Sequence, residues 1–175
     1  MARGPEAYRA RLQTLRDLPT FAALSDDAIE RIAEHVAEIT IQPGAHLCRQ
    51  GSPAMEAFII VGGIAQLIAD DTIVRDIERG ELIGEIAVLS GRPRTVSIRA
   101  LTKLEAFVLN AADVRWLMGD PTASAVVRDA MARHLGSDKE RHPDPDVLEI
   151  LRDRGVALAS AAGSLIGKAV KGLRG

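Results

Sequence analysis

The middle of the chain, over residues 38–109, consists of short apolar segments separated by glycine and aspartate turns. The apolar segments include AFIIVGG, IAQLIA, TIVRDIE and KLEAFVLN. Turns between such segments are indicated by Pro43-Gly44, Gly51, Gly62-Gly63, Asp70-Asp71 and Gly80. Many short strands with frequent turns are typical of antiparallel sandwiches and jelly rolls. The pattern therefore predicts an antiparallel β-roll over residues 38–109.

Helical periodicity flanks this β region on both sides. Residues 6–37 are predicted to form two helices, and Ser25 is a good N-cap for the second. Residues 110–136 are predicted to be helical, with one helix starting at the N-cap Asn110 and another at Asp120-Pro121. The second of these carries an apolar stripe of Val126, Val127, Ala130, Met131, His134 and Leu135. The predicted fold class is mainly β, with N-terminal helices and a C-terminal helix that follows the roll.

The end of the sequence has a different character. Residues 138–146 are polar and contain prolines, which indicates a linker. Residues 147–175 are predicted to form a helical, basic and amphipathic tail, with four cations and no acidic residue from Arg154 onward. Such a helix can pack on its own domain or on a second subunit, or it can lie on an anionic membrane surface. Packing on protein is the preferred interpretation.

The composition excludes several classes of protein. A chain of 175 residues with 47% hydrophobic and 26% charged residues suits one globular domain with a short appendage. A net charge of −2 gives no general attraction for nucleic acid. The single cysteine, Cys48, and the spacing of the four histidines argue against a metal site. The start of the sequence lacks an apolar signal segment, so a cytoplasmic location is expected.

The segment GELIGEIAVLSGRPRTVSIRA, residues 80–100, concentrates groups that bind small ligands. Gly84 has no Cβ, so a ligand can approach its backbone closely. The carboxylate of Glu85 can accept hydrogen bonds from a sugar hydroxyl, and the guanidinium of Arg94 can hold a phosphate. Thr95 adds a hydroxyl group beside Arg94. Together these groups suit a small ligand that carries both a phosphate and a sugar hydroxyl.

The order of these residues resembles the phosphate-binding cassette of cyclic nucleotide-binding domains. The matching residues are Gly84-Glu85-Ile86-Ala87, followed after a loop by Pro93-Arg94-Thr95-Val96-Ser97. The resemblance extends over residues 18–136. It implies that Glu85 binds the ribose 2′-hydroxyl and that Arg94 binds the cyclic phosphate. Backbone N–H groups near Gly84, Ile86 and Ala87, together with the Thr95 hydroxyl, would complete the phosphate site.

The resemblance also implies where the base would lie. The weaker candidates for the base pocket are the strand residues Leu67, Val74 and Ile77. The family places a lid helix after the roll, so residues 121–136 would close over the base. His134, on the apolar stripe of that helix, is interpreted as a packed or capping residue rather than as a base contact.

These observations predict a cyclic nucleotide sensor without catalytic residues, which is not an enzyme and whose preferred ligand is cAMP, with cGMP as the alternative. No cofactor besides that ligand is expected, because no nucleophile, acid–base pair or metal cluster is evident. The expected output is movement of the lid helix, read by a protein effector or by a second copy in a homodimer. Binding to DNA is not expected, because residues 137–175 show no recognition-helix pattern.

A second hypothesis remains open. The chain could be an adaptor or structural module that keeps the roll without the ligand. The tail would then dock on a protein partner or, less favoured, on a membrane surface through residues 156–175.

Overall fold

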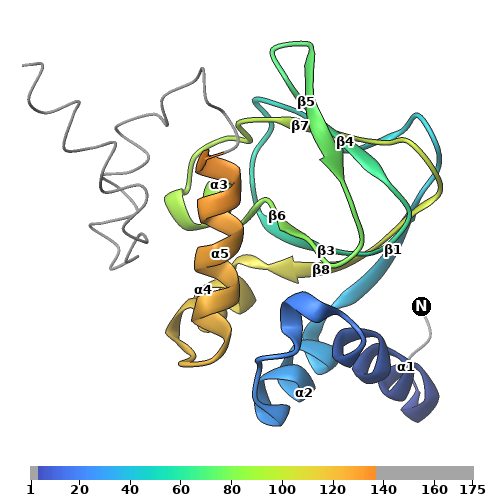
Figure 1. The fold of residues 1–175 in the computed structure, drawn as a ribbon, viewed down its shortest axis with the longest axis vertical. Helices are drawn as coiled ribbons and strands as arrows, with labels where there is room; N and C mark the ends of the chain where they lie inside the picture. The colour runs from blue at the N-terminus through green and yellow to red at the C-terminus, as the bar shows by residue number, and fades with distance from the viewer. Residues whose placement is uncertain (1–3, 137–175) are drawn as a thin grey trace, which may run out of the picture.

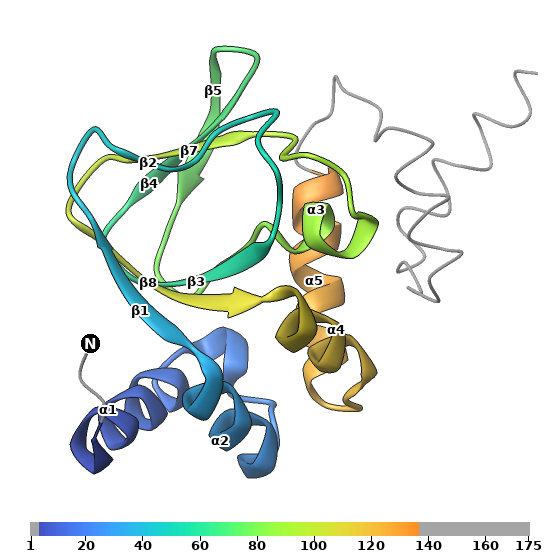
Figure 2. The same cartoon turned by 180° about the vertical axis from the view of Figure 1, so that it is seen from behind.

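The computed structural model describes residues 4–136, which form a β-roll flanked by helices (Figure 1). Residues 1–3 and 137–175 lie outside the described part, and so do the predicted linker at 138–146 and the predicted tail at 147–175. The N-terminal helices lie beside one sheet of the roll, and the remaining helices gather at one end of the roll (Figure 2).

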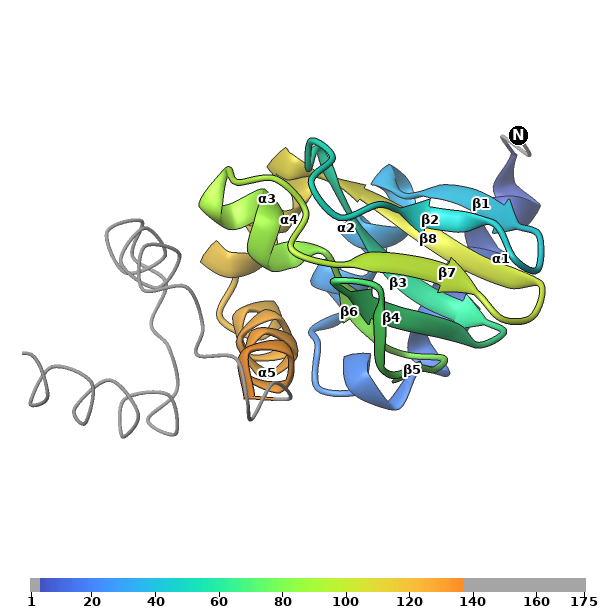
Figure 3. The same ribbon diagram turned by 90° about the horizontal axis from the view of Figure 1, so that it is seen from above.

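Two antiparallel four-stranded sheets make up the roll, which confirms the predicted fold class. The strand order of the first sheet is β1 (Ala37–Ile41), β8 (Leu104–Asn110), β3 (Glu56–Gly62) and β6 (Leu82–Ile83). The strand order of the second sheet is β2 (His46–Cys48), β7 (Ser97–Ala100), β4 (Ala65–Ala69) and β5 (Thr72–Ile77). The sheets face each other, and α3 leaves the roll between β6 and β7 (Figure 3).

The helices are α1 (Pro5–Arg16), the 3-10 helix η1 (Pro19–Phe21), α2 (Asp26–His35), α3 (Glu85–Ser90), α4 (Ala111–Gly119) and α5 (Ala123–Gly136). Two of them, α2 and α4, begin directly after N-cap residues that were predicted from the sequence. The Ser25 hydroxyl accepts a hydrogen bond from the Ala28 N–H at the start of α2. The Asn110 side chain forms a reciprocal capping box with Asp113 at the start of α4.

The last helix begins two residues later than the sequence predicted. The Asp120 carboxylate accepts hydrogen bonds from the N–H groups of both Thr122 and Ala123, each at 2.9 Å. These bonds hold Pro121 and Thr122 in a turn, so α5 starts at Ala123 instead of at Pro121. The same hydrogen bonds hold the pKa of the Asp120 carboxyl below its usual value.

Strand β3 is buried on both faces, which divides the apolar core into two clusters. Ala57 and Ile59 face the helices, and Phe58 and Ile60 face the interior of the roll. Alternate residues of a strand point to opposite faces. The continuous apolar run AFIIV therefore supplies both clusters at once.

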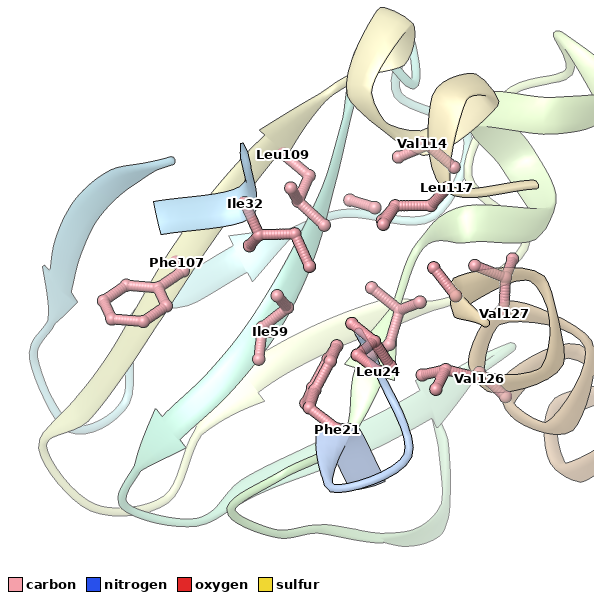
Figure 4. Close-up of a cluster of buried hydrophobic side chains, with 14 of the residues drawn as sticks. Phe21, Leu24, Ile32, Ile59, Phe107, Leu109, Val114, Leu117, Val126 and Val127 are labelled. Atoms are coloured by element: carbon pink, nitrogen blue, oxygen red, sulfur yellow. The ribbon is translucent and has the colours of Figure 1, made fainter. Parts of the chain in front are cut away.

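The larger cluster joins the first sheet to the helices (Figure 4). Its members from the sheet and from the N-terminal and C-terminal helices include Phe21, Leu24, Ile32, Ile59, Phe107, Leu109, Val114, Leu117, Val126 and Val127. This packing fixes α4 and α5 against the end of the roll where residues 80–100 lie. Among residues 4–136, no helix is both long and apolar enough to cross a lipid bilayer.

A glycine makes the turn between β6 and α3. Gly84 has φ 85° and ψ 0°, a left-handed conformation that residues with a Cβ adopt only at a cost. A Cβ at this position would also collide with the Nη1 atom of Arg94. Gly84 therefore allows both the turn and the close approach of the guanidinium.

Replacement of Ile59 by alanine should lower the free energy of unfolding by about 2–5 kcal/mol, because the side chain is fully buried between the sheet and the helices. Ile73 is also a strand isoleucine but is about half exposed. Its replacement by alanine should cost roughly 1 kcal/mol or less. Urea denaturation of both variants measures the difference, and equal losses would contradict the burial of Ile59.

Replacement of Gly84 by alanine should destabilise the protein by about 1–3 kcal/mol, because alanine is strained at this φ. The matched control is Gly119→Ala, since a Cβ at Gly119 meets no atom within 4 Å. Alanine there should be neutral or stabilising. Thermal unfolding compares the two variants, and an unchanged melting temperature for Gly84→Ala would rule out the strained turn.

Candidate ligand-binding site

Arg94 is buried between the start of α3 and the strand β3. Its Nη2 donates a hydrogen bond to the Glu56 carbonyl at 2.7 Å, and its Nη1 donates one to the Gly84 carbonyl at 3.3 Å. The guanidinium carbon lies 5.3 Å from the centre of the Phe58 ring, within the range of a cation–π contact. Only 5% of the residue is exposed. The side chain is therefore held in one position by backbone acceptors and an aromatic face.

The backbone of Arg94 is fixed as well. Its N–H donates to the Ser52 carbonyl at 2.9 Å, and its carbonyl accepts from the Gly51 N–H at 2.8 Å. The turn at residues 51–52 thus ties the end of the cassette to the loop that leads into β3.

The charge of Arg94 has no carboxylate partner among residues 4–136. The two hydrogen bonds of its guanidinium go to neutral carbonyls, and Nε is buried without any acceptor. Burial of a cation is costly unless an anion or several hydrogen bonds compensate for the lost water. Two of the five guanidinium N–H groups are used here. Arg94 is therefore able to bind an anion that brings further acceptors.

Glu85, the first residue of α3, is also buried completely. Its Oε1 lies 2.8 Å from Nδ1 of His134, and its Oε2 is buried without a hydrogen-bond partner. A buried carboxylate oxygen that accepts no hydrogen bond within the protein can accept one from a ligand group such as a hydroxyl. Arg94 and Glu85 thus supply complementary binding groups from the two ends of one short segment.

His134 comes from the last turn of α5 and contacts the carboxylate of Glu85. Besides its contact with Glu85, it is close enough to Glu81 to act on the titration of that carboxyl. Burial raises the pKa of Glu81, but hydrogen bonds from Arg75 and from the Glu78 N–H, with the charges of Arg75 and His134, lower it below its usual value overall. The Arg75–Glu81 pair is two-pronged, at 2.7 and 3.1 Å.

The other predicted cassette residues occupy different environments. Ala87 is buried, and Ile86 packs at the edge of the larger core cluster. Thr95 is exposed, and it follows the buried Arg94 directly. The structure places Ile86 and Ala87 within the short helix that begins at Glu85.

The candidates for the base pocket separate into two groups. Leu67 and Ile77 belong to the buried cluster inside the roll. Val74 is 36% exposed, and the register between β4 and β5 shifts next to it, from the pair Leu67–Arg75 to the pair Ile68–Ile73. Val74 is thus the extra residue of a β-bulge, so its side chain does not continue the alternation that runs through Ile77.

The functional residue that the sequence did not identify is His134. It was expected to be packed or capping, and it is packed, but it also contacts the Glu85 carboxylate across 49 positions of sequence. Its place on the apolar stripe with Val127, Ala130 and Met131 was a signal that it faces the domain. Nothing in the stripe shows which residue it meets, because that depends on how α5 packs against α3.

Comparison with known proteins agrees with this geometry. Residues 38–120 match the family model described as the cyclic nucleotide-binding domain. The acetyltransferase Pat of Mycolicibacterium smegmatis is 37% identical over 99 residues, which are 54% of this chain and 30% of the relative. A cyclic nucleotide-gated potassium channel of Rhizobium etli is 28% identical over 130 residues, 73% of this chain and 36% of the channel. The chain therefore spans about a third of the length of these curated relatives.

Solved structures show the same fold. A mutant of a cAMP-binding acyltransferase from Mycobacterium smegmatis superposes with a TM-score of 0.63 at 27% identity, covering 75% of this chain and 43% of that one. A PKAR domain with Sp-2Cl-cAMPS bound gives a TM-score of 0.64 at 16% identity and covers 89% of this chain and 98% of that one. The second likeness concerns the fold alone. Through its roll, its cassette and the matched segment 38–120, the chain belongs to the cyclic nucleotide-binding domain family.

Proposed function

We propose that this domain binds a 3′,5′-cyclic nucleotide and acts as a regulatory sensor, without chemistry on the ligand. Arg94 would bind the cyclic phosphate, and Glu85 would accept a hydrogen bond from the ribose 2′-hydroxyl. The N–H groups at Gly84, Ile86 and Ala87 would add donors to the phosphate oxygens.

One observation carries the proposal. Arg94 and Glu85 are both buried, they do not pair with each other, and each has a polar atom without a partner, Nε and Oε2. Natural proteins rarely leave such atoms unsatisfied, so each orphaned buried atom calls for an explanation. A ligand with an anionic group and a neighbouring hydroxyl accounts for both atoms.

The preferred ligand is cAMP rather than cGMP. The acyltransferase that resembles this chain at 27% identity is described as cAMP-binding, which favours the adenine nucleotide here.

Ligand binding would act on α5. Helix α5 contacts α3, which carries Glu85, and it also contacts α4 and β6. A ligand that binds one arrangement of α3 and α5 better than another shifts the equilibrium by that difference in affinity. The resulting change at α5 would be read by a protein effector or by a second copy of the chain.

Calorimetric titration with cAMP and with cGMP tests the proposal on the full chain. Saturable binding of at least one nucleotide is expected. Arg94→Ala should weaken it at least tenfold, because a hydrogen bond to a charged group contributes about 1.5–3 kcal/mol.

The matched control is Arg49→Ala. Arg49 is an exposed arginine on the adjacent loop, so this variant changes the net charge equally and should keep the affinity of the unmodified chain. Absence of binding to the unmodified chain, or equal affinities for the two alanine variants, would contradict the role of Arg94.

A further inference from the structure

The contact between His134 and Glu85 covers the carboxylate proposed to bind the ribose. His134 Nδ1 lies 2.8 Å from Glu85 Oε1, and Glu85 is fully buried. Both carboxylate oxygens are therefore closed to a molecule the size of water. A ribose hydroxyl oxygen is no smaller than that, so it can reach Glu85 only after a covering group moves.

The two sides of this contact are not held equally. Glu85 lies two residues after the end of β6, and α3 is packed into the larger core cluster through Val88 and Leu89. His134 lies at the far end of α5, eleven residues after the helix begins at Ala123. Helix α5 is buried in the same cluster as far as Met131, so the part of the contact that separates is His134 in the last turn.

We propose that His134 competes with the nucleotide for Glu85, so that nucleotide binding releases the His134 side chain from the carboxylate and is opposed by protonation of His134. This inference rests on the proposed function, because the ribose hydroxyl is the group that replaces His134 on the carboxylate. It makes the domain sensitive to both nucleotide and pH.

The sign of the pH effect follows from the hydrogen bond. With its proton on Nδ1, a neutral imidazole would donate one hydrogen bond to the carboxylate, whereas an imidazolium donates the same bond with a full positive charge. The full positive charge adds a Coulomb attraction to the carboxylate at this short distance, and that attraction is stronger in a buried site than in water. Protons therefore favour the closed contact, and nucleotide affinity should rise as pH increases.

The charges around His134 support this sign. On the segment before β6, Glu81 adds a second carboxylate near the ring, and Arg75 offsets that charge. Helix α3 contributes Glu85 alone, and neither η1 nor β6 contains a titratable residue. From α4 to the end of α5 there are three charges of each sign besides His134: Asp113, Arg115, Asp120, Arg128, Asp129 and Arg133.

The test is calorimetric titration of the full chain with cAMP and cGMP at pH 5.5, 6.5, 7.5 and 8.5. The unmodified chain should bind roughly tenfold more tightly at pH 8.5 than at pH 5.5. Near pH 6, repetition in buffers with different ionisation enthalpies should reveal net release of protons on binding. His134→Ala should bind more tightly than the unmodified chain at pH 5.5, with a flat pH profile.

Two further variants separate a titration from a packing effect. His134→Gln keeps a neutral donor at the same place, so its profile should be flat as well. His35→Ala removes an exposed histidine whose Nδ1 lies 2.8 Å from the Arg31 carbonyl of its own helix, so it should keep the pH dependence of the unmodified chain. Weaker binding by His134→Ala, or an unchanged pH dependence in His134→Gln, would overturn the competition.

A ligand-free measurement distinguishes failure of this inference from failure of the proposed function. In thermal unfolding, a double-mutant cycle of His134→Gln and Glu85→Gln should give a coupling between the two positions that is larger at pH 6 than at pH 8. If the coupling is found but no nucleotide binds, the contact between His134 and Glu85 is supported, and the cyclic nucleotide is refuted as the ligand that competes with His134. Nucleotide binding without coupling would refute the inference alone.

Discussion

The burial of two opposite charges on one short segment, without a bond between them, is the constraint on which the rest of the site depends. Arg94 is held by the carbonyls of Glu56 and Gly84, and Glu85 is held by His134. A direct ion pair would have satisfied both charges and left little for a ligand. Because the two are kept apart, the domain retains one anion-binding group and one hydroxyl-binding group in fixed positions.

The β-roll supplies the rigidity that keeps those charges apart. The turn at residues 51–52 binds the backbone of Arg94, β3 presents Phe58 beneath its guanidinium, and Gly84 gives room for Nη1. Each of these elements belongs to a different part of the sequence. Several parts of the roll thereby stabilise the buried guanidinium. The Glu85 carboxylate is instead stabilised by a contact from α5, which lies outside the roll.

This difference explains why Arg94 and Glu85 could be identified from the sequence, whereas the residue that contacts Glu85 could not. The roles of Arg94 and Glu85 were suggested by their residue types and by the motif around them, and a close approach to the backbone at Gly84 was suggested by its missing Cβ. His134 belongs to no such motif. Its stripe indicated only that it faces the domain, and its contact with Glu85 follows from the packing of α5 on α3 and β6. The bulge at Val74 was likewise invisible, because a register shift is decided by the partner strand.

Local patterns in the sequence determined the order of the elements. Alternation, glycine turns and the caps at Ser25 and Asn110 act over a few residues, so they predicted the flanking helices and the antiparallel roll. The tertiary structure alone decided that β3 is buried on both faces, that Arg94 meets no carboxylate among residues 4–136, and that His134 covers Glu85. Those outcomes are set by contacts between segments far apart in the chain, and the free energy of such contacts depends on the whole packed arrangement.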